Sequence, residues 1–536
     1  MQHSLNHIVI VGGGSAGWIT AGLLAAKHNV DQGKISPTPK LKITLIESPD
    51  VATIGVGEGT WPSMRSTLEK IGIDETTFLL RCDASFKQGS QFFHWAIEPN
   101  IRANLPFDQR HYFHPFSLPV GQPQFNAAPF WLPFNEQINF ADAVCNQATI
   151  AKHYLAPKQL ATPQYSFVNN YGYHLDAGKF SQLLTEHCTE NLGVLHLRSH
   201  VDKVHIASQD SANTKAGDIS AISTREHGLI EADLFIDCSG VKSMLLGESL
   251  NVPFISQQHI LFNDRALAVQ VPYLDSNAPI ESNTLSTAQD NGWIWDIGLP
   301  TRRGIGHVYS SSHIDDEQAL TDLINYLTPT LGKQAADINP RKLTINPGHR
   351  QVCWQQNCIA IGMSSGFIEP LEASALALVE WLANELSNQL PTNRLVMDTI
   401  AKRVNQQFTQ HWQQIIEFLK LHYVVSQRSS DYWQDHRSQA SALPSLTEKC
   451  QLWQHHVPSQ DEILHRNALF PAASFQYVLY GMGALTQAQM QLKPSDKQQA
   501  QQLFSQNAQR SKQLINALPS NRALLKQLRQ QSFAPM

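Results

Sequence analysis

The segment His7-Ile-Val-Ile-Val-Gly-Gly-Gly-Ser-Ala-Gly17 indicates the fold class. It begins with a short apolar run typical of a buried strand, and residues 18–27 continue with a helical pattern. Gly12, Gly14 and Gly17 have the spacing Gly-x-Gly-x-x-Gly, in which the first glycine permits a tight turn, the second lets the backbone approach a pyrophosphate, and the third lets helix and strand pack closely. The stretch therefore predicts a strand–turn–helix unit that binds a dinucleotide at the helix N-terminus.

A second strand, residues 41–46, ends at Glu47, where a carboxylate can bond a ribose hydroxyl. This acid comes later than the usual distance of about 20 residues because a polar insert, residues 29–40, lengthens the return crossing. Together with Ser15 and Ala16 of the turn, these residues form the expected cofactor site. The alternative is a glycine turn that merely packs.

The composition narrows the class of protein. A length of 536 residues suggests roughly two to four domain-sized units or one large fold, and a net charge of −5 argues against a nucleic-acid-binding protein. The N-terminus has no signal-peptide pattern, and no apolar run approaches the ~18 residues of a membrane span, so we expect a cytoplasmic protein with no membrane partner. The seven cysteines are scattered without a CxxC pair, which predicts neither disulfides nor a metal site.

Farther along the chain, the pattern alternates between strands and helices. Residues 96–165 are rich in Pro, Phe, Asn and Gln with little periodicity, which predicts an irregular segment carrying aromatic groups. Strands should dominate from about 259 to 310, and helices from about 393 onward. The other predicted elements are a helix over 177–191, a strand over 193–206, buried strands over 234–238 and 358–361, and an apolar helix over 373–386.

Two of these segments resemble flavoproteins of the aromatic-hydroxylase superfamily. The segments Leu234–Gly240 and Cys358–Gly366 are similar to the strands that return to the flavin there, although Gly362-Met363 replaces the usual Gly-Asp. The resemblance favours FAD over NAD. It implies an α/β fold with a Rossmann-like FAD-binding domain of the glutathione-reductase/aromatic-hydroxylase type, a substrate-binding β-sheet region and a mainly helical C-terminal region.

Further motifs resemble flavin-dependent tryptophan halogenases. Residues 55–62, Gly-Val-Gly-Glu-Gly-Thr-Trp-Pro, are similar to the family's GVGEAT-x-P segment. Residues 293–297, Trp-Ile-Trp-Asp-Ile, resemble its WxWxIP motif, with Gly298 in place of the proline. The segments 173–177, 422–433 and 475–483 also match, so the resemblance covers nearly the whole chain.

The resemblance assigns the chemistry to two residues. Lys87, in Phe-Lys-Gln-Gly, matches the lysine that holds the oxidant, and Glu372, in Pro-Leu-Glu-Ala-Ser, matches the essential glutamate. Taken singly, Lys87 would be read as a surface lysine and Glu372 as an acid favoured by a helix N-terminus. Glu369 is the nearest rival for the acid role.

The same family pattern implies the binding residues. Ser374 and Ala375 would offer backbone N–H groups to a halide ion at a helix start. His111, Phe113, Trp293 and Trp295 are candidates for contact with a flat substrate ring, with loop or core aromatics as the alternative. The remaining cofactor contacts implied by the resemblance are Gly55, Val56, Gly57, Glu58, Val201, Met363 and Leu376.

The implied function is halogenation of an indole or another electron-rich aromatic compound with chloride or bromide, using FADH2 from a separate flavin reductase and O2. Residues 1–392 would form a discontinuous module whose FAD segments are about 1–95, 175–245 and 340–392, and residues 393–536 would complete the substrate site. The resemblance leaves room for a homodimer. The alternatives are a flavin monooxygenase that hydroxylates an aromatic ring and a catalytically silent FAD-binding protein.

Overall fold

The computed structural model describes residues 4–31, 34–36, 41–51, 57–99, 111–211, 213–463, 468–487 and 492–534. The chain divides into two compact units, which we call the first and the second unit. The first unit comprises residues 1–83, 175–257 and 346–412, and the second comprises residues 84–174, 258–345 and 413–536.

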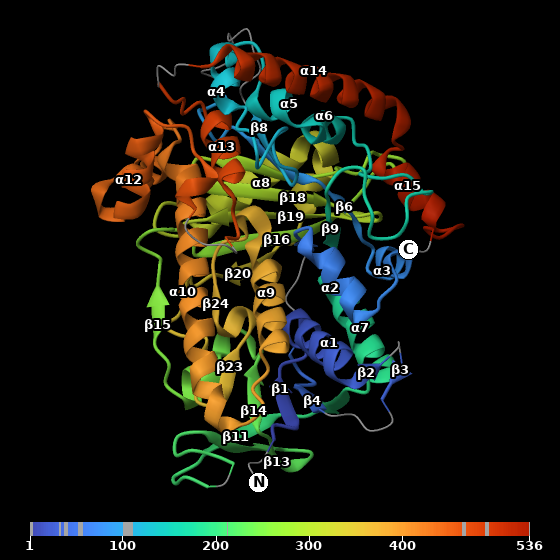
Figure 1. Ribbon diagram of the computed structural model, residues 1–536, viewed down its shortest axis with the longest axis vertical. Helices are drawn as coiled ribbons and strands as arrows, with labels where there is room; N and C mark the ends of the chain where they lie inside the picture. Colours follow the sequence, from blue (N-terminus) through green and yellow to red (C-terminus); the bar gives the residue numbers. More distant parts are fainter. Residues whose placement is uncertain are drawn as a thin grey trace. The chain divides into compact units, whose positions relative to one another are not determined.

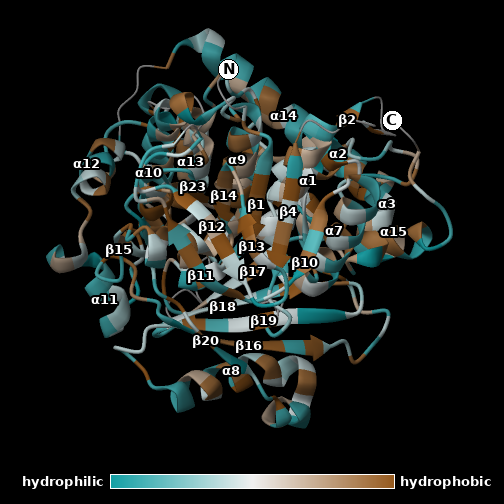
Figure 2. Ribbon diagram, turned by 90° about the horizontal axis from the view of Figure 1, so that it is seen from below, coloured by the Kyte–Doolittle hydropathy of each residue, from teal (hydrophilic) through white to brown (hydrophobic). Residues whose placement is uncertain are grey.

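A six-stranded sheet with the order β10-β4-β1-β14-β23-β22 forms the centre of the first unit. β1 (His7–Val11) pairs in parallel with β4 (Lys42–Glu47) on one side and with β14 (Leu234–Asp237) on the other. β10 (Leu195–Arg198) and β23 (Cys358–Ala360) continue the parallel ladder. Side chains on both faces of β1 are fully buried, as expected for a parallel strand covered on both sides. Figure 2 shows β14, β1 and β4 side by side, with hydrophobic residues along them.

Helices cover one face of this sheet. α1 (Ser15–Asn29) packs against α2 (Ser63–Ile71), α7 (Ala177–Asn191) and α9 (Ser374–Asn388), and Figure 1 shows α1 and α9 next to each other. A hydrophobic cluster joins the sheet to a smaller one of order β11-β12-β13. The other elements of this unit are β2 (Val30–Asp31), β3 (Lys34–Ile35), β5 (Glu58–Gly59), α3 (Glu75–Arg81), β11 (Val201–Ile206), β12 (Ile219–Thr224), β13 (Gly228–Glu231), η2 (Gly240–Lys242), η3 (Met244–Ser249), β15 (Phe254–Ser256), β21 (Gly348–Arg350), β22 (Trp354–Gln355), η5 (Gly362–Ser364), β24 (Gly366–Phe367) and η6 (Leu371–Ala373).

The second unit contains a seven-stranded sheet with the order β20-β16-β19-β18-β17-β7-β8. α8 (Asp316–Leu331) packs on it through a hydrophobic cluster, and Figure 2 shows this helix beside β16 and β20. The strands of this unit are β6 (Ser85–Lys87), β7 (Gly89–Phe93), β8 (His111–Pro115), β9 (Gly172–Leu175), β16 (Arg265–Pro272), β17 (Thr284–Gln289), β18 (Gly292–Gly298), β19 (Arg302–Tyr309) and β20 (Arg341–Thr344). Its helices are α4 (Ala128–Trp131), η1 (Leu132–Phe134), α5 (Phe140–Val144), α6 (Asn146–Lys152), α8, η4 (Gly332–Asp337), α11 (Asp431–Arg437), η7 (Gln439–Ser441), α12 (Pro444–Trp453), η8 (Gln460–Glu462), α13 (Ala472–Gly481), α14 (Pro494–Ala517) and α15 (Asn521–Leu528); α10 (Arg394–Val424) contains the boundary between the units.

The strand–turn–helix start, the strands between 259 and 310 and the helical C-terminal region are confirmed. The single strand predicted over 193–206 is wrong: β10 joins the large parallel sheet and β11 joins a separate antiparallel one, because the chain turns between them. The irregular segment predicted over 96–165 is wrong in part, since among its described residues 111–115 form a sheet strand, and three short α-helices and one 3-10 helix follow. Among the described residues, no helix combines the length and apolar character that a membrane crossing requires.

Candidate active site

The glycine turn between β1 and α1 has the geometry of a phosphate-binding turn. Gly12 has φ +121°, and a Cβ there would lie 2.1 Å from the carbonyl oxygen of Cys238. A Cβ on Gly17 would lie 2.0 Å from the carbonyl oxygen of Gly12, so this glycine allows close packing of helix and strand. A Cβ on Gly14 would have nothing within 4 Å, which leaves open space in front of the N-terminus of α1. The turn therefore fits the pyrophosphate of a dinucleotide.

Glu47 lies at the end of β4, next to this turn. Its carboxylate is so close to Gly13 that a Cβ there would lie 2.3 Å from the carboxyl carbon. His196 Nε2 lies 2.8 Å from Glu47 Oε2. The sequence did not identify His196, because only the pairing of β10 with β4 brings the two residues together.

A further segment of the first unit approaches the turn. Gly362, at φ +82°, leaves so little space that a Cβ there would lie 2.8 Å from the Cβ of Ala16, and Met363 follows it directly. Val201 packs on the cluster that contains Val11 and Ile46, the residues preceding Gly12 and Glu47. Ser15 begins α1. The structure thus brings Glu47 and the Gly362-Met363 segment to the turn, whereas Val201 contacts the hydrophobic cluster of the sheet.

The glycine-rich segment 55–62 is described in part. Gly55 and Val56 lie outside the described residues. Gly57 has φ +154°, and burial raises the pKa of Glu58 to about 7 although part of its side chain stays accessible. Trp61 donates an indole N–H to the backbone oxygen of Glu372 at 2.8 Å. Trp61 therefore contacts the predicted catalytic segment, although the sequence analysis did not identify it as a site residue.

Glu372 stands in a strained turn directly before α9. It has φ +63° and ψ 6°, and Ala373 follows with φ +54° and ψ 44°. Two successive non-glycine residues in the left-handed region are rare, and each costs roughly 1–3 kcal/mol. The side chain of Glu372 is 7% exposed, and that of its rival Glu369 is 1% exposed. Glu369 is therefore a buried residue and not a solvent-facing acid at a helix start.

The N-terminus of α9 follows this turn. Ser374 is its first residue and is buried, Ala375 is exposed, and Leu376 is buried. The N-cap residue Ala373 makes no side-chain hydrogen bond to the first turn of the helix. Backbone N–H groups at such a terminus suit an anion.

A buried carboxyl group lies farther along the same helix. Glu380 is 2% exposed and accepts hydrogen bonds from Ser63 Oγ at 3.0 Å and Thr67 Oγ1 at 2.5 Å. Burial raises the pKa of Glu380 to about 8. Two hydrogen-bonded links therefore hold this part of the chain together: Glu380 joins α9 to α2, and Trp61, two residues before α2, joins it to η6.

Lys87 ends the short strand β6 in the second unit and is completely buried. Its Nζ lies 5.3 Å from the centre of the Phe116 ring. Burial, together with the charge of Lys87, lowers the pKa of His174 well below its usual value, so the ring of His174 is neutral. His174 Nε2 bonds to Thr284 Oγ1 at 2.8 Å. Lys87 is therefore not a surface lysine.

The two tryptophans of β18 lie in different surroundings. Trp293 is 1% exposed, and its ring lies 6.1 Å from that of Trp95. Trp295 is half-buried and covers Gly306, where a Cβ would lie 2.1 Å from the indole. β18 continues through Gly298, which pairs with Arg303 of β19, so the position that carries a proline in the family remains part of the ladder here.

His111 and Phe113 belong to β8. His111 is half-buried, and Phe113 is 3% exposed. A cavity of about 10 Å³ adjoins both residues, which is room for roughly one water molecule and not for an aromatic ring. Tyr112, between them, stacks on Phe92 with ring centroids 4.6 Å apart.

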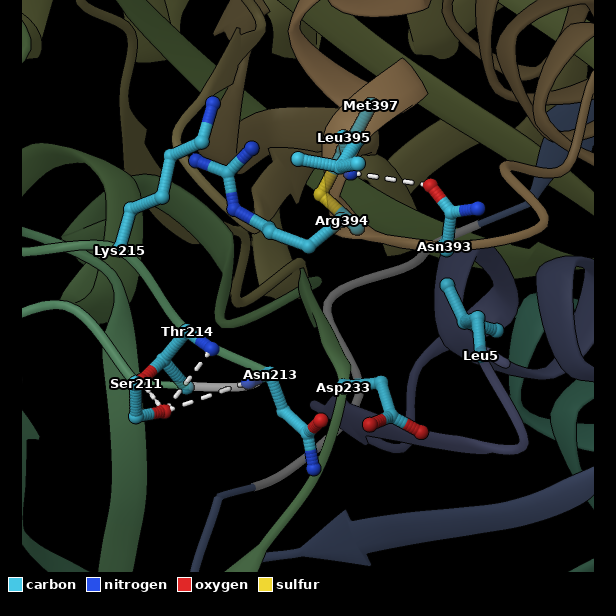
Figure 3. Close-up of a pocket in the computed structure, with 10 residues that line it drawn as sticks. All are labelled: Leu5, Ser211, Asn213, Thr214, Lys215, Asp233, Asn393, Arg394, Leu395 and Met397. Carbon is cyan, nitrogen blue, oxygen red and sulfur yellow. Dashed lines mark hydrogen bonds between the residues drawn. The ribbon is translucent and has the colours of Figure 1, made fainter. Parts of the chain in front are cut away.

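A separate surface pocket of about 70 Å³ lies in the first unit, around the start of α10 (Figure 3). Its two cations are paired: Arg394 binds both carboxylate oxygens of Asp218, at 2.7 and 2.8 Å, and Lys215 lies 2.6 Å from Asp398. The pocket is small and its charges are compensated, so it is not a candidate for the substrate or the halide.

The parallel sheet and its glycine turn define an α/β protein of the nucleotide-binding oxidoreductase class. A family model described as tryptophan halogenase matches residues 7–497. The chain belongs to the tryptophan halogenase family.

Known proteins similar to this chain agree with that assignment. A crystal structure of a tryptophan halogenase from Shewanella frigidimarina NCIMB 400 is 59% identical over 100% of both chains, with a TM-score of 0.95. The 7-chloro-L-tryptophan 6-halogenase KtzR of Kutzneria sp. (strain 744) is 31% identical over 97% of this chain and 99% of its own length. BrvH, a flavin-dependent halogenase from Brevundimonas sp. BAL3, is 28% identical over 98% of this chain and 99% of its own, with a TM-score of 0.82.

The chain is therefore a flavin-dependent halogenase and an oxidoreductase. Both the family and the α/β architecture with a helical C-terminal region are as predicted. Membership of this family does not favour a hydroxylating monooxygenase or a silent flavin-binding protein.

Proposed function

We propose that this enzyme halogenates an indole or a similarly electron-rich aromatic compound with chloride or bromide, using FADH2 that a separate flavin reductase supplies. The observation that carries the proposal is the complete burial of Lys87, at the position of the family's lysine motif. A solvent-facing lysine could not keep a reactive oxidant from water. A fully buried amine could.

The geometry of the first unit supports a dinucleotide cofactor, which membership of the family implies to be FAD. The turn Gly12–Gly17 would hold the pyrophosphate, and Glu47 the ribose, with Met363 nearby. When bound, reduced flavin would supply two of the four electrons that reduce O2, and the halide ion would supply the other two, so that hypohalous acid and water form. The backbone N–H groups of Ser374 and Ala375 would hold that halide ion. The start of α9 supports this assignment, because its N-cap residue makes no side-chain hydrogen bond to the helix.

Lys87 would receive the oxidant, either by a hydrogen bond from its amine to the oxygen or as a haloamine. The apolar face of Phe116 near the amine would limit the access of water. The substrate ring would then attack the halogen and become a cation. Glu372 would stabilise that cation and accept its proton.

The names of the relatives support a substrate that bears an indole ring. KtzR acts on 7-chloro-L-tryptophan, and the relative from Shewanella frigidimarina is named a tryptophan halogenase. We therefore propose an indole ring as the substrate core, borne by free tryptophan, free indole or a larger molecule. Trp295, which is half-buried, is a better candidate than the fully enclosed Trp293 for contact with that ring.

The test is mass spectrometry of indole and of tryptophan after incubation with the protein, FAD, a flavin reductase, NADH and bromide. A product heavier by bromine, with hydrogen lost, supports the proposal. A product heavier by oxygen alone would identify a hydroxylase instead. If neither compound changes, the proposed substrate class is wrong.

A further inference from the structure

β6, the strand that ends at Lys87, lies at the edge of its sheet. Its residues pair with β9 on one side, where Phe86 faces Tyr173 and Lys87 faces Gly172. Phe86 and Lys87 are both completely buried, so water cannot satisfy the backbone groups on the outer side of the strand. The amide of Asn521 does so: its Nδ2 donates to the backbone oxygen of Phe86 at 3.2 Å and to that of Glu281 at 3.3 Å.

Asn521 is itself fixed by the segment around it. It is completely buried at the start of α15, and its backbone N–H donates to the oxygen of Tyr154 at 2.8 Å. The N–H of Ala156 donates to the oxygen of Pro519 at 2.9 Å, and Ser520 forms a β-bridge with Leu155. Residues 519–521 are thus joined to residues 154–156.

The same contacts reach the residue on the other side of Lys87. Gln88 Nε2 and Ser282 Oγ both donate to the backbone oxygen of Leu155, each at 2.8 Å. The N–H of Gln88 donates to the oxygen of Ser282 at 2.6 Å. A hydrogen-bond network that includes residues 519–521 therefore holds both neighbours of Lys87. It binds Phe86 directly and Gln88 through Leu155.

Further side-chain contacts of the C-terminal region add to this network. Phe533 lies 6.5 Å from the Phe86 ring, and Lys158 Nζ lies 4.0 Å from the centre of the Phe533 ring. Leu514 and Leu518 pack with residues of the 150–155 region in a hydrophobic cluster. All of these C-terminal residues follow the last residue that the family model matches, at 497.

We propose that Asn521 is a positioning residue for Lys87, and that the C-terminal segment 519–534 is needed for transfer of the halogen and not for binding of the flavin. The proposal rests on the role of Lys87 given above. Asn521 fixes the peptide that precedes Lys87. A shift of about 1 Å in a reacting group can cost roughly 100-fold in rate.

The chain offers a matched control in Asn507 of α14. It is 3% exposed, and its Nδ2 also donates to two backbone oxygens, those of Asp142 at 3.1 Å and Ala143 at 3.0 Å. Asn521→Asp and Asn507→Asp each replace a buried donor by a carboxylate that faces two carbonyl groups. Both should lower the melting temperature, but Asn507 holds no residue adjacent to Lys87.

The measurement is halogenated product formed per reduced flavin oxidised, together with the Kd for FAD and the rate of flavin reoxidation. Asn521→Asp should lower the product yield roughly 10- to 100-fold with unchanged flavin parameters, whereas Asn507→Asp should keep the yield. The yield of Asn521→Asp relative to wild type should rise as the pH falls, because the protonated carboxyl can again donate to Phe86. If Asn521→Asp does not fold, the pair Asn521→Ser and Asn507→Ser carries the same expectation of yield without a buried charge.

Equal yields in the two asparagine variants would overturn the inference, as would an unchanged yield in Asn521→Asp. The variant Lys87→Met, measured alongside, distinguishes a failure of the positioning role of Asn521 from a failure of the proposed role of Lys87. If Lys87→Met loses product and the asparagine variants do not differ, only the positioning role fails. If Lys87→Met retains product, the proposed role of Lys87 fails and the inference fails with it.

Discussion

Glu372 is held in a backbone conformation that its own side chain does not favour. Glu372 and Ala373 both have positive φ, and the indole N–H of Trp61 binds the peptide oxygen of Glu372. Such strain persists where surrounding contacts hold it, and it is concentrated at functional sites. The turn before α9 therefore supports a role for Glu372 independently of the sequence motif.

Glu372→Gln should reduce halogenation by about 100- to 1000-fold, because the amide keeps the size of the side chain but removes the charge that would stabilise the ring cation. Flavin reoxidation should continue. The check is product per reduced flavin oxidised. Glu380→Gln is the matched control, since Glu380 is also buried, at 2% exposed against 7% for Glu372, and its pKa of about 8 already keeps it neutral near pH 7. If the Glu380 variant is inactive and the Glu372 variant active, the assignment of the acid is wrong.

Lys87→Ala should abolish halogenation while the flavin is still reduced and reoxidised, because Lys87 acts after the oxidant forms. Since Lys87 is completely buried, Lys87→Met is the better-packed companion variant. Lys420, another completely buried lysine of the second unit, gives the control Lys420→Met. A Lys87 variant that kept a substantial part of the wild-type product yield would contradict the proposed role.

Two substitutions in the turn between β1 and α1 should have different effects, one on the stability of the fold and the other on cofactor binding. Gly12→Ala introduces a Cβ 2.1 Å from a carbonyl oxygen at φ +121°, so it should destabilise the fold by more than about 2 kcal/mol. Gly14→Ala meets no atom within 4 Å, so it should leave stability nearly unchanged and weaken FAD binding by about tenfold or more, because its methyl group occupies the expected pyrophosphate space. Thermal melts and FAD titrations distinguish the two. An unchanged Kd in Gly14→Ala would argue against this site.

The buried carboxyl group of Glu380, at the contact between α2 and α9, should make the free energy of unfolding depend on pH. The pKa of Glu380 is about 8 in the folded protein and near 4.5 when the chain is unfolded. The folded state then binds more protons between these values, so its stability is greatest at the acidic end and declines as the pH rises toward about 8, by up to about 1.4 kcal/mol per pH unit. Glu380→Gln lacks this titration, so its melting temperature relative to wild type should increase over that range. A constant difference would show that the carboxyl does not titrate in this way.

The sequence contains one Gly-x-Gly-x-x-Gly pattern for dinucleotide binding, and this pattern lies in the first unit. We therefore expect the purified protein to bind FAD but not to oxidise NADH at a rate that matches halogenation. Addition of a flavin reductase should restore turnover. Spectrophotometric NADH consumption by the protein alone, at the turnover rate, would contradict the proposed separate reductase. The division of the chain into flavin and substrate modules, and a homodimer, stay predictions.

Sequence patterns alone were enough to predict the family, the strand–turn–helix start and the order of the main elements. These follow from local patterns: glycine spacing, apolar periodicity and short motifs act within a few residues. For the same reason, the sequence identified Lys87 and Glu372 as candidates. It misread 193–206 because the break at Ser199 lies between two segments with similar strand patterns, and their sheets differ only in their partners.

The surroundings of these residues could not be predicted from the sequence, because they depend on the packed fold. Burial of Lys87, the left-handed turn at Glu372 and the link from Trp61 depend on contacts between segments far apart in the chain. Asn521 reaches Phe86 across 435 positions, and no spacing rule connects them. Such contacts arise when buried backbone groups must find partners that water cannot provide, and the chain that supplies them is fixed only when the whole unit has packed.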